Sequence, residues 1–136
     1  MKRVIFLLVI IIGFSFPLWA ENIILSSDIP INKLDLNFAH VIKVNAIKNL
    51  EDWRFDVTLL HNDTGWNHYA DLWVVVDSQT GEEYGRRVLT HPHVNEQPFT
   101  RSQTGIKIPA TVETVIVKAA CNVHGFGGTE LSISLK

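Results

Sequence analysis

The chain has 136 residues, 46% of them hydrophobic, and its twelve basic and fourteen acidic side chains give a formal net charge of −2. This length and apolar content suit a single domain with a hydrophobic core of its own. The mildly acidic balance and the lack of any basic run argue against nucleic acids and anionic membrane surfaces as partners.

The first twenty residues have the pattern of a secretory signal peptide. Lys2 and Arg3 precede a nearly unbroken apolar run over 4–16, and Ala20 supplies the small residue expected at a cleavage site. The run is shorter than the roughly 20 residues of a transmembrane helix, although an uncleaved anchor is the alternative interpretation. Cleavage after Ala20 would leave residues 21–136 with ten basic and fourteen acidic side chains, a net charge of −4, without stable membrane insertion.

Short strands separated by turn residues are expected along the whole mature chain. In chain order they cover 22–26 (as an edge strand), 38–47, 53–60, 69–77, 84–91, 105–108, 113–121 and 129–135. Between the fourth and fifth strands, the sequence SQTG (78–81) predicts a hairpin turn. No segment shows sustained helical periodicity, so the domain over 21–136 is expected to be all-β.

Alternating apolar residues predict which faces of these strands are buried. The sets expected to share one face are Trp53, Phe55, Val57 and Leu59; Ala70, Leu72, Val74 and Val76; and Val115, Val117 and Ala119. Seven or eight such strands predict a single antiparallel β-sandwich. An up-and-down barrel is the competing architecture, but the irregular connection expected over 92–104 favours the sandwich.

Two resemblances support this interpretation. The segment VIVKAACNVHGFGGTELSISL (115–135) resembles the last two strands of immunoglobulin-like or fibronectin type III-like domains, which implies that sandwich architecture. The segments GWNHYADLW (65–73), HPHVNEQPFTR (91–101) and VHGFGG (123–128) together resemble a group of small exported bacterial proteins. This second resemblance implies a periplasmic or secreted protein and assigns no activity and no site residues.

The directions of the expected strands place five of the six histidines at one end of the sandwich. The segments 53–60 and 113–121 run toward that end, as does the strand after the SQTG hairpin, whereas 69–77 leaves it. The side chains placed there are His61, His68, His91, His93 and His124, with Cys121 just beneath them. His40 alone is expected elsewhere.

The motif His91-Pro92-His93 is the strongest candidate for a metal-binding pair. Its two histidines are two residues apart on extended backbone, so both point to one face, and Pro92 restricts the backbone between them. Imidazole nitrogen suits copper and zinc, and a cysteine thiolate would favour copper. The expected ligands are His91, His93, His68 and His124, with Cys121 and His61 as further candidates.

Structural interpretations of the same residues remain open at this point. The His-Pro-His motif could be a polar turn, and Cys121, the only cysteine, could be a buried apolar residue. No nucleophile elbow, phosphate loop or His-Glu-x-x-His motif is present, so we do not expect an enzyme. The sequence favours a periplasmic copper- or zinc-binding carrier, chaperone or buffer. The alternative is a non-metal interaction or accessory module that binds a protein or an extracellular ligand through the same loops.

Overall fold

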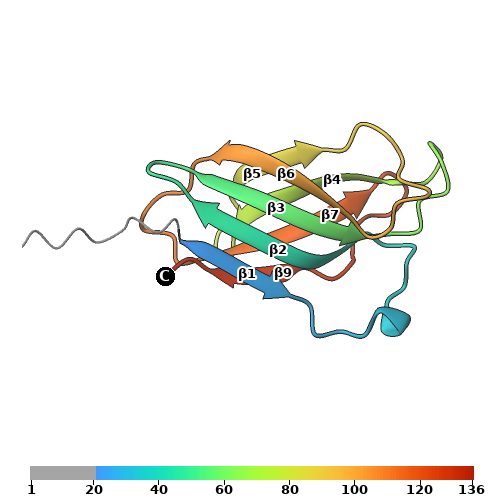
Figure 1. Cartoon of the computed structure of the whole chain (residues 1–136), viewed down its shortest axis with the longest axis horizontal. Helices are drawn as coiled ribbons and strands as arrows, with labels where there is room; N and C mark the ends of the chain where they lie inside the picture. The colour runs from blue at the N-terminus through green and yellow to red at the C-terminus, as the bar shows by residue number, and fades with distance from the viewer. Residues whose placement is uncertain (1–20) are drawn as a thin grey trace, which may run out of the picture.

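The computed structural model describes residues 21–136, which form two antiparallel sheets packed face to face (Figure 1). The expected all-β sandwich is therefore confirmed. Within this part of the chain the only helix is the three-residue 3-10 turn η1 (Ile31–Lys33), and no helix is long and apolar enough to cross a membrane. The expected signal peptide lies outside the described residues.

The two sheets divide the strands in the manner of an immunoglobulin-like or fibronectin type III-like sandwich. The first sheet has the order β1 (Asn22–Ser26), β2 (His40–Lys48), β3 (Trp53–Leu60), β6 (Phe99–Ile106). The second has the order β5 (Glu83–Val88), β4 (Ala70–Asp77), β7 (Thr114–Cys121), with β8 (Gly125–Phe126) and β9 (Leu131–Ser134) both pairing with β7. The chain crosses between sheets after β3, β5 and β6, as such sandwiches require.

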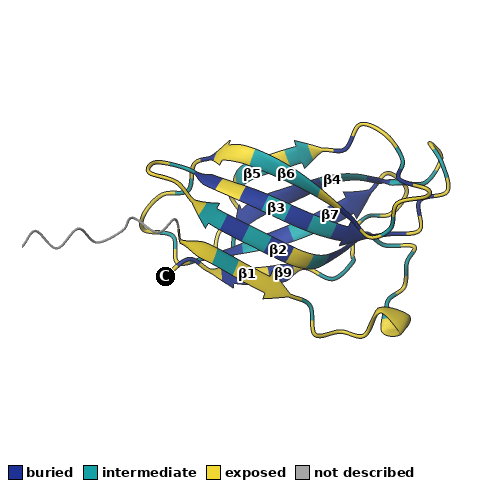
Figure 2. Cartoon of the chain, viewed as in Figure 1, coloured by how far each residue is buried: buried dark blue, intermediate teal, exposed yellow. Residues whose placement is uncertain are grey.

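The inward faces of β3 and β7 are the ones that the sequence predicted. Trp53, Phe55, Val57 and Leu59 of β3 all belong to the core, as do Val115, Val117 and Ala119 of β7. Figure 2 shows the buried residues concentrated on the central strands of the two sheets, with exposed residues on β1 and on the connecting loops. Strict alternation predicts these two strands well because each presents one face to the opposite sheet and one outward.

Strand β4 departs from the predicted grouping. The core contains Ala70, Trp73 and Val75, whereas the sequence placed Ala70 with Leu72 and Val74. The pairing of β4 with β7 shifts register between Ala70 and Leu72. One extra residue in a strand turns all following side chains to the other face, so this β-bulge explains the difference.

Strand β6 is longer than predicted and begins earlier. The sequence predicted a short strand over 105–108 after an irregular connection, but the strand runs from Phe99 to Ile106. Only these two terminal residues are buried, because β6 is an edge strand whose middle faces solvent. The apolar alternation on which the prediction depended is therefore absent from its middle.

The glycine pair after β8 lets the last loop touch the start of β2. A Cβ atom on Gly128 would lie 1.9 Å from the carbonyl oxygen of Ala39, so only glycine fits there without moving the backbone. Next to it, the N–H of Val41 donates to the carbonyl of Thr129 at 2.8 Å. This contact holds the turn before β2 close to the end of β7.

Candidate metal site

One end of the sandwich gathers segments from four parts of the chain. Strand β3 ends there at Leu60, β4 begins there at Ala70, and Ala70 is paired with Cys121, the last residue of β7. Strand β2 also begins at this end, since His40 is paired with Leu60. The expectation that His40 lies elsewhere is thus wrong, because β2 runs antiparallel to β3.

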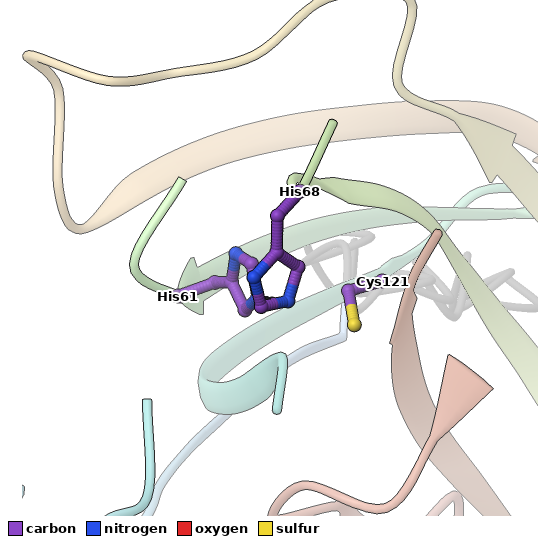
Figure 3. A group of neighbouring side chains, drawn as sticks. All are labelled: His61, His68 and Cys121. Carbon is purple, nitrogen blue, oxygen red and sulfur yellow. Dashed lines mark hydrogen bonds between the residues drawn. The ribbon is translucent and has the colours of Figure 1, made fainter. Parts of the chain in front are cut away.

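His61 and His68 face each other across this end. Their Nε2 atoms are 3.2 Å apart, and the two rings meet edge to face with centroids 4.7 Å apart. The donor atoms of His61, His68 and Cys121 all lie within 4.8 Å of one another (Figure 3). Among residues 21–136, no other group of three or more His, Cys, Asp or Glu side chains brings its donor atoms together in this way.

A backbone carbonyl oxygen lies close to the donor atoms of all three side chains. The carbonyl oxygen of Asn37 is 3.3 Å from Nε2 of His61, 3.3 Å from Nε2 of His68 and 3.6 Å from the sulfur of Cys121. The turn that carries it is fixed by His40, whose Nε2 bonds the Asp35 carbonyl at 2.7 Å. Sequence reasoning could not find this oxygen, because every residue carries a backbone carbonyl.

Asp63 sets the orientation of His61. Its Oδ1 accepts a hydrogen bond from His61 Nδ1 at 2.5 Å and one from the Ala70 N–H at 3.0 Å, and its Oδ2 accepts one from the His93 N–H at 2.7 Å. Burial alone raises the pKa of Asp63, but these bonds outweigh burial and hold that pKa below its ordinary value.

The bond to Asp63 also decides which nitrogen of His61 can bind a ligand. Since Nδ1 carries the proton that Asp63 accepts, Nε2 of a neutral His61 presents a lone pair toward His68. Metal-ligating histidines commonly donate their other N–H to a carboxylate in this way. The His61-x-Asp63 spacing on extended backbone, which puts both side chains on one face, was a signal for this pair.

His93 lies beside this network and supports it mainly through its backbone. Its ring stacks on Phe99 at a centroid distance of 3.9 Å, and its Nε2 is 2.9 Å from a guanidinium nitrogen of Arg101. Burial lowers the pKa of His93, and the charge of Arg101 lowers it further. Its Nδ1 has no hydrogen-bond partner and is 3.9 Å from Asp63 Oδ2.

The other two predicted ligands are exposed. The His91 ring lies 4.5 Å from that of His93, and its Nδ1 contacts the Pro92 carbonyl at 3.0 Å. The His124 ring lies 5.2 Å from that of His68, at the rim of the site. Of the predicted ligands, the structure therefore brings together His61, His68 and Cys121, with His124 next to them and the His-Pro-His motif outside the cluster.

Comparisons with known proteins find one relevant relative. No family model matches the chain, and no solved structure matches it. Over 103 residues the chain is 38% identical to a protein of Halomicrobium mukohataei described as "Putative lipoprotein". The match covers 75% of this chain and 50% of the relative, so the chain spans about half the length of that protein.

Proposed function

We propose that this protein is an exported β-sandwich that binds a copper or zinc ion at His61, His68 and Cys121. Its role would be that of a metal carrier, chaperone or buffer. The observation that carries the proposal is the 3.2 Å separation of the two Nε2 atoms, with the Cys121 sulfur no more than 4.8 Å from either. Imidazole and thiolate together are the ligands that copper and zinc take in proteins.

The spacing of the two nitrogens suits simultaneous metal binding. Two nitrogens bound to one ion at about 2.0 Å and at a tetrahedral angle are about 3.3 Å apart, close to the observed 3.2 Å. His61 needs no reorientation, because Asp63 already directs its Nε2 lone pair toward His68. His61 and Cys121 are buried and His68 is half-buried, so an ion would enter from the His68 side.

Binding can be tested by titrating apo protein with copper(I), copper(II) and zinc under buffered metal conditions. Wild type is expected to bind one equivalent with a micromolar or lower Kd. His68→Gln should bind at least about 100-fold more weakly, because losing a direct ligand costs at least as much as losing an outer partner of a ligand, which is about 10–100-fold. The matched control is His91→Gln, which changes an exposed histidine outside the cluster and should leave the affinity unchanged. Loss of binding in His91→Gln but not in His68→Gln would instead assign the ion to the His-Pro-His motif.

Export is the second part of the proposal. It is supported by the signal-like pattern of residues 1–20 and by the lipoprotein description of the relative. Lipid attachment itself is not carried over, because the only cysteine of the printed sequence is Cys121, which is buried. Periplasmic rather than secreted location is proposed from the resemblance of three segments to small exported bacterial proteins.

The proposed export can be tested directly through cleavage of the expected signal peptide. Intact-mass measurement of the exported protein should show a chain that begins at Glu21, because cleavage is expected after Ala20. A full-length chain recovered from the membrane fraction would contradict the assignment.

A non-metal interaction module remains the second candidate function. Apolar side chains are exposed on the loops of the same end: Trp66 at 65%, Val123 at 54% and Val94 at 52%. Exposed apolar side chains of this size mark protein contacts when they form a patch. If neither wild type nor any variant binds metal, these loops are the surface on which to seek a protein or other extracellular ligand.

A further inference from the structure

We infer that the ion at this site is copper, held by His61, His68 and Cys121 with the Asn37 carbonyl as a weak fourth donor, and that it exchanges single electrons. This inference rests on the proposed metal binding and adds to it the identity of the metal and a redox activity.

The fourth donor distinguishes the site from an ordinary closed zinc site. The Asn37 oxygen is 3.3 Å from both nitrogens and 3.6 Å from the sulfur, as expected for one vertex of a shared coordination polyhedron. Structural zinc sites take four cysteine or histidine ligands, whereas two histidines and one cysteine with a weak backbone oxygen are typical of electron-transfer copper sites. The donors at this end of the sandwich therefore match those of an electron-transfer copper site.

The sulfur of Cys121 is shielded from solvent and has a backbone hydrogen-bond donor beside it. It is buried, with the residue 2% exposed, and it accepts a hydrogen bond from the backbone N–H of His124 at 3.2 Å. Hydrogen bonds to the sulfur and an apolar surrounding are the features that tune the potential of a copper–thiolate centre. Binding of copper would release the thiol proton, which the Asn37 carbonyl accepts in the apo protein.

The ligands are held by parts of the fold that do not depend on the ion. His61 follows β3, Cys121 ends β7, and the turn carrying Asn37 is fixed by the hydrogen bond of His40. An electron donor would reduce Cu(II) to Cu(I), and an acceptor would reverse this, with no bond to the protein made or broken. A site whose ligand positions are set by the sandwich changes little between the two states, which favours rapid electron exchange.

Access for a redox partner lies on the side of His68. Of the three side-chain ligands it is the only one that is not buried, and its ring lies beside the exposed ring of His124. The partner is therefore a one-electron donor or acceptor that docks over this end of the sandwich.

The test is to load the apo protein with Cu(II) and record its visible absorption and electron paramagnetic resonance spectra. We expect an intense visible band from sulfur-to-copper charge transfer, which ascorbate bleaches and ferricyanide restores over repeated cycles. Cys121→Ser should lose the band by at least about tenfold, because the thiolate is its source. His91→Gln, which changes an exposed histidine outside the cluster, is the control and should retain it.

The possible failures are distinguishable. Wild type that binds Cu(II) with only a weak absorption unaffected by Cys121→Ser, or that binds zinc in preference to both copper states, would overturn the copper inference and leave the proposed metal binding intact. Failure of ferricyanide to restore the band after the first reduction would overturn the electron-exchange part. Absence of binding by any of these metals to folded protein would overturn both proposals. Circular dichroism of each variant establishes that it is folded.

Discussion

Asp63→Ala is expected to lower the free energy of unfolding by about 3 kcal/mol or more, the largest loss from any single side chain at the candidate site. The Asp63 carboxylate has no solvent exposure and accepts hydrogen bonds from His61 Nδ1, the Ala70 N–H and the His93 N–H. Its removal leaves three buried donors without an acceptor, each at a cost of roughly 1–3 kcal/mol if no water replaces it. Chemical denaturation monitored by tryptophan fluorescence measures the loss.

The same variant should weaken metal binding although Asp63 is not a ligand. Without its acceptor the His61 ring can rotate or change tautomer, and losing such an outer partner lowers metal affinity by about 10–100-fold. Asp28→Ala, which removes an exposed carboxylate far from this network in sequence, is the control and should change neither quantity. Asp63→Ala with wild-type stability and affinity would show that Asp63 does not position His61.

Val117→Asp is expected to prevent folding of the domain at ordinary temperatures. Val117 is completely buried in the core, where its strand neighbours are Val75 of β4 and Leu131 of β9. A carboxylate there would lose its hydration without gaining a partner, at a cost of several kcal/mol, which is comparable with the whole stability of a small domain. The far-ultraviolet circular dichroism of the variant should lack the β signal of wild type.

The matched control is Val88→Asp, the same substitution in another strand. Val88 is 57% exposed at the end of β5, so its replacement should cost less than about 1 kcal/mol. A folded Val117→Asp protein with wild-type stability would contradict the assignment of the inward face of β7.

The sequence by itself determined the class of fold and the inward faces of two central strands. Alternation over 53–60 and 113–121 has one physical cause, since successive residues of a strand point to opposite faces. Where the ladder is regular, as along β7 from Thr114 to Ala119, the pattern in the sequence and the burial in the structure agree. The direction of these strands also placed His61, His68 and Cys121 at one end.

The prediction from alternation failed in β4 and β6, where the strand is irregular or its residues face solvent. The register shift between Ala70 and Leu72 reverses the faces of β4, and a bulge leaves no alternation signal of its own. The polar middle of β6 faces solvent at the edge of a sheet, so its pairing with β3 has no hydrophobic signature. The faces of β4 and the extent of β6 therefore depend on the strands with which they pair, and not on their local residues alone.

Only the tertiary structure decided which histidines share a site. The sequence emphasised His91 and His93 because they are close in the chain, whereas the donor atoms that converge belong to His61, His68 and Cys121. The 3.2 Å approach of two imidazoles depends on the path of the 61–68 loop, and the Asn37 oxygen arrives through a turn pinned by His40. Strand direction can bring residues to the same end of a sandwich, but an arrangement accurate to a fraction of an ångström depends on loop conformations and hydrogen bonds between distant segments, which no local pattern encodes.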